Sequence, residues 1–369
     1  MQPGTTTTLA DLTTMRVGGP AGRLVTAESA DAVVDAVRAA DAAGEPLLVL
    51  SGGSNLVVAD AGFPGTVVRV VSRGAAPESA SACAGVTLRV AAGEPWDELV
   101  AEAVGHGWSG IEALSGIPGA AGATPVQNVG AYGQEVAHTI AQVRTWDRRD
   151  RRVRTFTAAE CGFGYRVSRF KAEQLGPHGS VPGGPRYVVM EVVFQLERNR
   201  LSQPIGYADL ARQLGVAVGE RVPLADAREG VLAQRRQRGM VLDDADHDTW
   251  CCGSFFTNPV LDHDGYAALA DRVARRLGGD QLPPRFPGEG GAVKTSAAWL
   301  IERAGFGKGF GMPGPAALST KHTLAVTNRG WATAADVIAL ARTVRDGVVE
   351  AFGIRLVNEP VLVGCSLDD

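Results

Sequence analysis

Three short segments of this 369-residue chain place reactive side chains among glycines, aromatic residues or turn residues: residues 163–166, 253–259 and 358–360. In the first segment, Arg166 offers a planar guanidinium that matches the geometry of a carboxylate. Ser254 offers a small hydroxyl donor after a flexible glycine, and Glu359 offers an acid or a hydrogen-bond partner. Residue type alone favours simpler alternatives, namely a surface arginine, a turn serine and a solvated glutamate.

Other common catalytic sets find little support. The chain has no Gly-x-Ser-x-Gly elbow, and the histidines nearest to Ser254 in sequence, His247 and His263, imply nothing about it, so a serine hydrolase is not indicated. Cys251 and Cys252 are adjacent, which favours packing thiols over a redox pair. The 6 histidines are scattered singly, and we predict no metal.

The glycine-rich segment 114–133 suits neither a long helix nor a strand. Its glycines let backbone amides approach a ligand closely, and Pro118 and Pro125 restrict its conformations. Consecutive amides in turns form concave anion sites, to which Gln127 and Asn128 add uncharged donors. We interpret the segment as a loop that lies along a phosphate chain. An ordered glycine-rich connector is the alternative.

A second phosphate-loop candidate follows a short buried strand at residues 47–50, which runs into the amide-rich turn at residues 51–55. Two such loops make a dinucleotide the natural ligand. The nicotinamide pattern Gly-x-Gly-x-x-Gly occurs at residues 105–110 and 309–314, but each copy follows a predicted helix instead of a strand. We expect Gly105 to end its helix, and a proline spoils the second copy as a helix start, so neither copy is taken as a binding site.

Alternating strands and helices up to about residue 200 must position these loops, and they predict one α+β domain. A helix capped by Ser29 should end near Gly44. Further elements are expected as strands at 66–71 and 86–90, a helix at 96–104, a hairpin of 143–146 with 153–156, and a long strand at 187–196. We expect the small-residue segment 74–84 to be a mobile loop, and the basic run 148–154 to be the solvated turn of the hairpin.

The chain changes character at residues 199–204, which predicts a second domain beyond them. Helices are expected at about 206–215, 223–238, 264–277 and 296–304. Thr333 caps a final helix with an apolar stripe. Residues 280–291, with three prolines, should form a loop, and residues 354–364 are strand-like.

Composition limits the partners. With 36 basic and 40 acidic residues the net charge is -4, so nothing favours nucleic acid. No apolar run approaches the roughly 20 residues of a membrane span, and the N-terminal residues are polar. We therefore expect a cytoplasmic protein with no membrane insertion and no obligate protein partner. The 5 cysteines are an odd number without zinc-site spacing, which indicates free thiols.

Five motifs follow one another in one order with compatible spacing: residues 51–56, 117–133, 163–166, 253–259 and 297–301. In this order they resemble the UDP-N-acetylenolpyruvoylglucosamine reductase family, the flavoenzymes of peptidoglycan precursor synthesis. The resemblance spans residues 13–364. Tyr207, within residues 203–210, further resembles the subclass that keeps a tyrosine-bearing insert between its flavin and substrate domains.

The resemblance implies an α+β fold with a vanillyl-alcohol-oxidase-type FAD-binding domain at residues 1–200. A smaller α+β substrate-binding domain would follow at 201–352, and a C-terminal segment, 353–369, would return toward the active site and the FAD domain. It also implies noncovalent FAD, NADPH as the reductant, and reduction of UDP-N-acetylglucosamine enolpyruvate to UDP-N-acetylmuramate.

The same resemblance implies roles for individual residues. Arg166, Ser254 and Glu359 would be catalytic. The positions matched to FAD binding are Ser51, Gly52, Gly53, Ser54, Asn55, Leu56, Ser115, Gly119, Gly122, Ala123, Thr124 and Gly130. The positions matched to the UDP-sugar are Tyr132, Tyr165, Tyr207, Arg238, Asn258 and His322.

Two positions depart from the family pattern. Arg238 stands where many members have a lysine, which keeps the positive charge and changes its geometry. Residues 358–361, Asn-Glu-Pro-Val, lack the more usual Glu-Val pair, so Glu359 is matched by its distance from Gly364.

Two other functions remain open from sequence. An oxidase of the same flavin fold would use dioxygen and often attaches its flavin through a histidine, which neither phosphate loop contains. A noncatalytic nucleotide-binding protein would need only the phosphate loops and would leave Ser254 and Arg166 unexplained. A flavin that resists extraction would favour the oxidase, and a bound flavin that NADPH cannot bleach would favour the binding protein.

Overall fold

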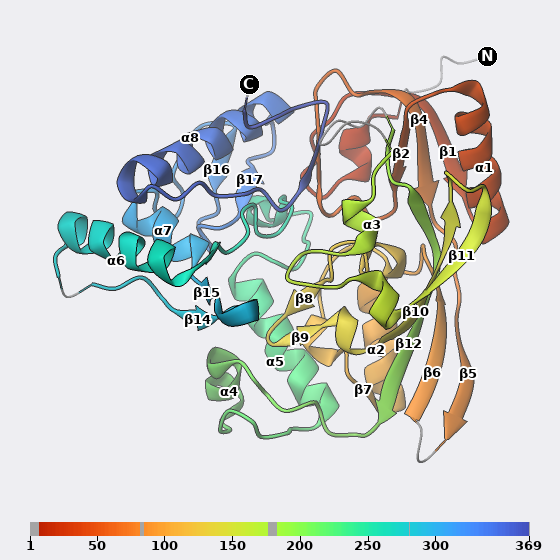
Figure 1. Cartoon of the computed structure of the whole chain (residues 1–369), viewed down its shortest axis with the longest axis horizontal. Helices are drawn as coiled ribbons and strands as arrows, with labels where there is room; N and C mark the ends of the chain where they lie inside the picture. Colours follow the sequence, from red (N-terminus) through yellow and green to blue (C-terminus); the bar gives the residue numbers. More distant parts are fainter. Residues whose placement is uncertain (1–6, 82–84, 176–182, 280, 369) are drawn as a thin grey trace. The chain divides into compact units, whose positions relative to one another are not determined.

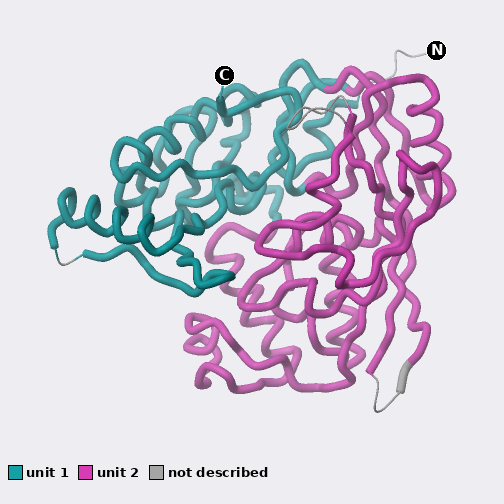
Figure 2. The backbone as a smooth tube through the Cα atoms, viewed as in Figure 1, with its two compact units in different colours: residues 1–20, 54–62, 242–369 teal, residues 21–53, 63–241 magenta. Residues whose placement is uncertain are grey.

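The computed structural model describes residues 7–81, 85–175, 183–279 and 281–368. The chain forms two compact units, which Figure 2 shows in different colours. Unit 1 comprises residues 1–20, 54–62 and 242–369, and unit 2 comprises residues 21–53 and 63–241. Helices and strands occur together in both units, so the predicted α+β class is confirmed.

The elements of unit 2, labelled as in Figure 1, are β1 (Ala21–Ala27), α1 (Ala30–Ala43), β2 (Leu47–Leu50), β4 (Phe63–Val70), β5 (Ala75–Ser81), β6 (Gly85–Ala91), α2 (Trp96–His106), β7 (Trp108–Ser109), η2 (Glu112–Leu114), η3 (Ala121–Ala123), β8 (Gly130–Ala131), β9 (Gln134–Glu135), η4 (Val136–His138), β10 (Ile140–Asp147), β11 (Arg152–Thr157), η5 (Ala158–Cys161), α3 (Arg169–Ala172), β12 (Tyr187–Arg198), α4 (Ala208–Leu214) and α5 (Leu224–Gln237). Those of unit 1 are η1 (Leu9–Leu12), β3 (Leu56–Val58), η6 (His247–Thr249), β13 (Val260–Leu261), α6 (His263–Leu277), β14 (Phe286–Pro287), η7 (Glu289–Gly291), β15 (Val293–Lys294), α7 (Ala297–Arg303), β16 (Ala316–Leu318), β17 (Val326–Asn328), α8 (Ala334–Phe352) and β18 (Val361–Val363).

A small parallel sheet of order β1-β4-β2 begins unit 2. Its connecting helix α1 starts where the Ser29 side chain accepts a hydrogen bond from the backbone N–H of Ala32 (3.1 Å). The helix ends at Gly44, whose φ of 65° lies in the left-handed region. Both predicted ends of this helix, and the strand at residues 47–50, are therefore confirmed.

A larger antiparallel sheet of order β11-β10-β12-β6-β5 forms the rest of the core of unit 2. The valines of β12 are buried on successive residues, while β6 alternates between buried and half-buried positions. Burial on successive residues is typical of a strand covered on both faces, as β12 is over most of its length. Alternating burial is typical of a strand with one covered face, as in β6. The predicted hairpin and long strand are confirmed as β10, β11 and β12.

The segment 74–84 was expected to be a loop, and this expectation is wrong. Residues 75–81 form β5, an edge strand paired with β6, while residues 82–84, Cys83 included, lie outside the described part. Where described, its side chains are largely exposed, so no apolar alternation marked it in the sequence. Its backbone pairing alone makes it a strand, and Pro77 sits beside a bulge, where an edge strand tolerates proline.

Two local expectations in unit 2 also need correction. Helix α2 continues through Gly105 and ends at Gly107, whose φ of 73° supplies the left-handed cap. Arg148 belongs to the basic run but is not solvated. Its side chain is 5% exposed and forms an ion pair of 2.7 Å with Asp41 of α1.

Helices α4 and α5 pack in unit 2 through a small apolar cluster that includes Ala113, Ile205, Leu210 and Val231. The division into units describes packing. The predicted division into FAD and substrate domains at residues 200 and 352 describes function and stays a prediction.

Unit 1 is built around α8, whose N-terminus is capped by Thr333 as predicted, and the cap is a capping box with Asp336. The Thr333 hydroxyl accepts from the N–H of Asp336 (3.1 Å), and the Asp336 carboxylate accepts from the N–H of Thr333 (2.9 Å). The predicted stripe, Val337, Ile338, Ala341, Val344 and Val348, is buried. Two short sheets accompany the helix, β16-β17 and the parallel pair β18-β3.

The predictions for the last two segments were too coarse. Only residues 361–363 of the strand-like segment 354–364 form a strand, β18, because proline and turn residues precede it. The predicted loop at 280–291 contains β14, which pairs with β15 and completes the sheet β13-β15-β14. Residue 280 lies outside the described part.

Candidate active site

The two predicted phosphate loops meet within unit 2. A Cβ placed on Gly52 would lie 2.6 Å from the Cα of Gly119, so the two backbones touch where neither residue has a side chain. Gly53 and Gly119 have φ values of 57° and 117°, which other residues rarely adopt. The turn after β2, which begins at Ser51, and the glycine-rich segment therefore approach each other backbone to backbone at Gly52 and Gly119. Closely spaced backbone without side chains suits a phosphate-bearing ligand.

The predicted row of amide donors is shorter than expected. The N–H groups of Gly122, Ala123 and Thr124 donate to the carbonyls of Ala92, Ala120 and Ala121 at 2.8–3.1 Å. These three residues therefore shape the loop with their amides, and their assignment to FAD stays a prediction.

Side chains within the glycine-rich segment hold its turns. The Thr124 hydroxyl donates to Ala121 O (2.7 Å), and the Ser115 hydroxyl donates to Glu112 O (2.6 Å). Asp97, at the start of α2, accepts the N–H of Gly116 (2.6 Å) and a two-point contact from Arg228 (2.6 and 2.9 Å). Burial alone would raise the pKa of Asp97, but these donors hold it below its ordinary value.

Asn128 was expected to donate to a ligand, and the structure shows another use. Its side-chain nitrogen donates to the Glu135 carboxylate (2.7 Å) and to Gly164 O (3.1 Å), while its side-chain oxygen accepts from the N–H of Ala137 (3.1 Å). The residue is 1% exposed and has a left-handed φ of 48°. Asn128 thus ties the glycine-rich segment to the turn that carries Arg166.

Arg166 lies directly against the glycine-rich segment. Its guanidinium donates to Gly130 O (3.0 Å) and Asn128 O (3.4 Å), and its φ of 57° is unusual for a residue with a side chain. The Tyr165 ring centre lies 5.4 Å from the guanidinium carbon. A bridge between Gly164 and Val167 closes the turn. These contacts fix the cation beside Gly130, one of the predicted FAD positions.

Tyr132, Tyr207 and Arg238 gather in unit 2, although they are far apart in sequence. The two tyrosine rings stand edge to face with centres 5.5 Å apart, and the Arg238 guanidinium carbon lies 5.9 Å from the Tyr132 ring centre. Arg238 also approaches the Asp209 carboxylate at 3.6 Å. Burial raises the pKa of Tyr132 despite the opposing charges of Arg235 and Arg238, so its hydroxyl stays a neutral donor.

Ser254 and Glu359 come together in unit 1. Glu359 N–H donates to Phe255 O (2.9 Å), Thr257 N–H donates to Val357 O (2.9 Å), and Phe256 bridges Asn358 in antiparallel fashion. Phe255 and Phe256 are fully buried and anchor this pairing. Ser254 is therefore one residue from the partner of Glu359, while Arg166 belongs to unit 2.

The second half of the first phosphate turn also belongs to unit 1. After Ser54, the side chain of Asn55 donates to Glu359 O (3.3 Å), and Asn55 O accepts from Val361 N–H (3.0 Å). Leu56 opens β3, which pairs with β18. The segment that carries Glu359 is thus attached to this turn by backbone and side-chain bonds.

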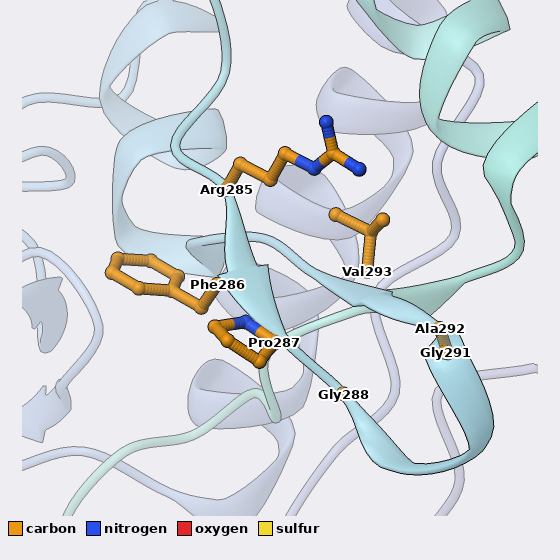
Figure 3. A pocket seen from close by; sticks show the side chains of 7 residues that line it. All are labelled: Arg285, Phe286, Pro287, Gly288, Gly291, Ala292 and Val293. Carbon is orange, nitrogen blue, oxygen red and sulfur yellow. The ribbon is translucent and has the colours of Figure 1, made fainter.

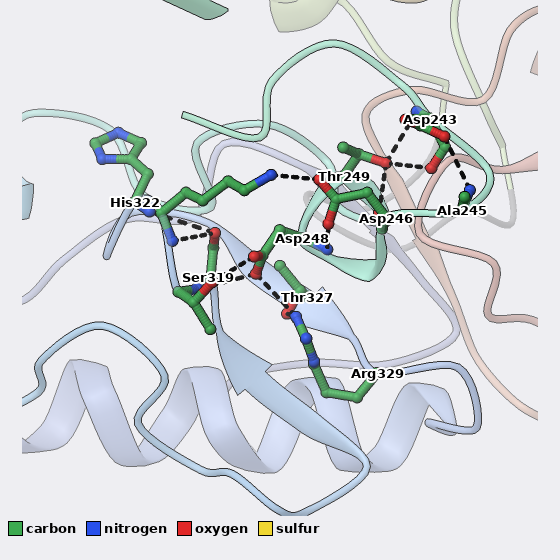
Figure 4. Close-up of polar contacts among 11 residues, drawn as sticks. Asp243, Ala245, Asp246, Asp248, Thr249, Ser319, His322, Thr327 and Arg329 are labelled. Atoms are coloured by element: carbon green, nitrogen blue, oxygen red, sulfur yellow. Dashed lines mark hydrogen bonds and ion pairs between the residues drawn. The ribbon is translucent and has the colours of Figure 1, made fainter. Parts of the chain in front are cut away.

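Asn258 and His322, the remaining predicted substrate residues, lie in unit 1. The side-chain oxygen of Asn258 accepts from the N–H of Ala297, at the start of α7 (2.9 Å). The backbone N–H of His322 donates to Ser319 Oγ (3.3 Å) within the polar network of Figure 4.

Asp248 is the centre of that network. It accepts from the N–H (2.9 Å) and hydroxyl (2.5 Å) of Thr320 and from Arg329 (2.8 Å). Burial alone would raise the pKa of Asp248, and these donors lower it instead. The carboxylate therefore stays ionised and fixes the turn before His322.

Asp97, Asn128 and Asp248 were missed as supporting residues. Asp97 and Asp248 occur in ordinary polar contexts, and nothing in the local sequence shows which distant N–H groups they meet. Asn128 was noticed, but its left-handed conformation, which turns its side chain to protein partners, has no sequence signal of its own.

Other features of the described residues offer no competing chemistry. They contain no group of three or more His, Cys, Asp or Glu side chains that could hold a metal ion. Burial raises the pKa of the Cys161 thiol to about 12 and that of Cys365 to about 11, and it raises that of Cys252 as well. Thiols of this kind are poor nucleophiles at neutral pH. No helix of the described part is long and apolar enough to cross a membrane.

A surface pocket in unit 1, shown in Figure 3, lies in the β14–β15 hairpin. Its lining residues are Arg285, Phe286, Pro287, Gly288, Gly291, Ala292 and Val293. None of the predicted site residues belongs to this lining, so the pocket does not mark the candidate active site.

Comparisons with known proteins match two parts of the chain to two family models. The model of an FAD binding domain matches residues 21–156, and that of the C-terminal domain of UDP-N-acetylenolpyruvoylglucosamine reductase matches residues 244–363. The chain is 56% identical to the UDP-N-acetylenolpyruvoylglucosamine reductase of Thermobifida fusca over 97% of both chains. It is 56% identical to that of Streptomyces coelicolor, over 97% of this chain and 90% of the relative. The crystal structure of the reductase from Thermus caldophilus is similar with a TM-score of 0.62, at 25% identity over 97% of both chains.

Proposed function

Because the chain belongs to the UDP-N-acetylenolpyruvoylglucosamine reductase family, we propose that Arg166, Ser254 and Glu359 carry the reaction of that family in this protein. The protein reduces UDP-N-acetylglucosamine enolpyruvate to UDP-N-acetylmuramate, a step of peptidoglycan precursor synthesis. Its cofactor is noncovalent FAD, and NADPH is the reductant. The oxidase and the noncatalytic binding protein are therefore set aside.

The residues present fit a bound dinucleotide. Gly52 and Gly119 meet without side chains, which leaves backbone free to follow a pyrophosphate. We assign the pyrophosphate to residues 52–55 and 119–124, and Ser115 and Gly130 to the same cofactor. When bound, FAD supplies the transfer of hydride from NADPH to the substrate double bond.

Arg166 stabilises the charge that develops on the substrate. Hydride addition to the terminal carbon of an enol ether conjugated to a carboxylate leaves negative charge on the adjacent carbon and on the carboxylate. A planar guanidinium binds a carboxylate at two points, and its contacts with Gly130 O and Asn128 O hold it in place beforehand. Because the Arg166 guanidinium does not have to move during the reaction, it can stabilise the negative charge as that charge develops.

Ser254 delivers the proton to the internal carbon, and Glu359 completes the hydrogen-bond arrangement. The hydrogen bond from Glu359 N–H to Phe255 O and the isolated Phe256–Asn358 bridge hold the backbone segments of Ser254 and Glu359 next to each other. A serine hydroxyl is a very weak acid, so Ser254 acts as a relay that another group re-protonates.

Six residues are proposed to recognise the UDP-sugar: Tyr132, Tyr165, Tyr207, Arg238, Asn258 and His322. The cluster of Tyr132, Tyr207 and Arg238 supports this assignment, since aromatic faces beside a guanidinium suit a nucleotide with phosphates. The contact of Tyr207 with Tyr132 also supports membership in the tyrosine-insert subclass.

The observation that carries the catalytic assignment is the clamp on Arg166, a left-handed arginine held by two carbonyls of the glycine-rich segment. The test is anaerobic. NADPH should bleach the flavin of the purified protein, and the enolpyruvyl UDP-sugar should then restore its colour. A flavin that only dioxygen restores would contradict the assignment.

We propose a cytoplasmic location, since NADPH and UDP-sugars are charged and do not cross membranes unaided.

A further inference from the structure

Glu112 is a buried carboxylate to which no role has been assigned above. The residue is 1% exposed, and N–H donors surround it. One carboxylate oxygen accepts from the N–H of Gly110 (2.6 Å). The other accepts from the side-chain nitrogen of Gln134 (2.9 Å) and from the N–H of Gln203 (2.6 Å). A buried carboxylate is costly unless it is hydrogen-bonded, and charge-assisted bonds of this length offset that cost.

The three donors come from three different segments of unit 2. Gly110 lies between β7 and η2, Gln134 lies in β9, and Gln203 lies between β12 and α4. The side-chain oxygen of Gln134 also accepts from the N–H of Ala113 (2.8 Å), so its amide is held from both sides. The Gln203 side chain donates to Ser109 Oγ (3.3 Å). Glu112 is thus the common partner of these segments.

Two of these segments carry the tyrosines of the proposed substrate site. Tyr132 lies two positions before Gln134, and Tyr207 lies four positions after Gln203. Their rings meet edge to face at 5.5 Å. Tyr132 is also in a left-handed conformation, with φ of 50°, so its direction depends on how the β8–β9 turn is held.

We propose that Glu112 is a positioning residue for recognition of the UDP-sugar. Its carboxylate binds Gln134 and Gln203, and these residues lie on the two segments that carry Tyr132 and Tyr207. The inference rests on the proposed role of those tyrosines at the substrate. An aromatic pair that is held in place before binding loses little conformational freedom when the ligand arrives. Arg166 contacts Gly130 O in this β8–β9 hairpin, but it also donates to Asn128 O, and Asn128 is bonded to Gly164 O and Ala137 N–H and not to Glu112. Glu112 therefore acts mainly on affinity for the sugar nucleotide and leaves the chemical step nearly unchanged.

The test is Glu112→Gln in the full-length holoenzyme. In either orientation the glutamine amide turns an NH₂ group toward at least one of the three N–H donors, so one acceptor is lost and two donors face each other. The dissociation constant of the enolpyruvyl UDP-sugar for the oxidised enzyme, measured by calorimetry, should rise roughly tenfold, which is ~1.4 kcal/mol. KM for this substrate should rise in parallel, with kcat and the rate of bleaching by NADPH close to wild type.

A matched control separates positioning from general loss of stability. Asp147 is also fully buried and also accepts backbone N–H groups, in the β10–β11 hairpin. Asp147→Asn should lower the melting temperature and leave both substrate KM values unchanged. Should Glu112→Gln fail to fold, Gln134→Met serves instead. It removes the bonds of the half-buried Gln134 side chain to Glu112 and to the N–H of Ala113, and it nearly keeps the side-chain volume. It should raise KM in the same direction.

Tyr207→Ala distinguishes failure of this inference from failure of the proposed substrate site. If Tyr207→Ala leaves sugar affinity unchanged, the proposed role of Tyr207 is wrong. If Tyr207→Ala weakens binding while Glu112→Gln and Gln134→Met do not, the positioning role of Glu112 is overturned and the substrate site stands. In the double variant the effect of Glu112→Gln should shrink, because it acts through the tyrosine that has been removed.

Discussion

Ser254 is the residue at which the two half-reactions can be separated. If its hydroxyl only protonates the internal carbon, Ser254→Ala should leave bleaching by NADPH near normal and slow reoxidation by the sugar substrate about 10² to 10⁴-fold. Flavin content and melting temperature should stay close to wild type, since one small half-buried hydroxyl is removed. Stopped-flow absorbance measures both halves. Equal slowing of the two, or unimpaired reoxidation, would falsify Ser254 as the proton donor.

Arg166→Lys tests the geometry of the cation. A lysine keeps the charge, but it cannot donate from two fixed positions to Gly130 O and Asn128 O while it meets a planar carboxylate. We expect a loss of roughly 10² in the reoxidation rate with little change in reduction by NADPH. Arg169→Lys, at the start of the adjacent helix α3, is the matched control, and it should leave the rates of flavin reduction and reoxidation unchanged. Wild-type turnover of Arg166→Lys would make Arg166 a structural residue.

Single residues show how far sequence reasoning about the site could reach. Motifs placed Arg166, Ser254 and Glu359 among reactive candidates because glycine and turn residues surround them. The meeting of Tyr132 with Tyr207 could not be predicted, since it depends on how a turn and a distant segment pack around Glu112. The role of Asn128 was hidden for a similar reason, because its partners lie on other segments.

At the scale of elements, the sequence predicted the helices and strands in which burial of one face gives a periodic pattern of apolar residues. Helix α8 was predicted with its cap and stripe because one face packs and the other is solvated. Strand β5 was missed because its described side chains are largely exposed, so hydrogen bonds to β6 define it and hydrophobic pattern does not. Backbone pairing leaves no trace in residue type when neither face of a strand is covered.

The β10–β11 hairpin provides a prediction about pH. Burial alone would raise the pKa of Asp147, but Arg186, bound at 2.9 and 3.1 Å, and two backbone N–H groups lower it. A carboxyl with a lowered folded pKa stabilises the protein above its unfolded pKa of about 3.9, and this contribution is lost as pH falls through the folded pKa. Urea unfolding should show Asp147→Asn as less stable than wild type at neutral pH, with the difference narrowing below about pH 4. A difference that stays constant in acid would show that Asp147 does not titrate as inferred.

At the scale of the molecule, the boundary at residue 200 illustrates a limit of composition. The chain changes character there, yet residues 201–241 pack in unit 2 through Ile205, Leu210 and Val231. The unit in which a segment packs depends on which apolar faces meet. A change in amino-acid composition marks only where one succession of helices and strands gives way to another. The predicted functional boundary therefore needs a functional test.

The whole chain also predicts how the two substrates share the enzyme. Neither Gly-x-Gly-x-x-Gly copy leads from a strand into a helix: residues 105–110 span the end of α2 and β7, and residues 309–314 form turns before β16. The described chain thus has no nicotinamide fingerprint in its usual setting, which favours NADPH binding in space that overlaps that of the UDP-sugar. After it has reduced the flavin, the cofactor must then leave as NADP⁺ before the sugar binds. Initial rates should give parallel double-reciprocal lines, with inhibition by either substrate at high concentration, because each excludes the other. Intersecting lines would show that both bind at once, and a second NADPH site would then have to be sought. Glu112→Gln supplies the control, since it should raise KM for the sugar and keep the lines parallel.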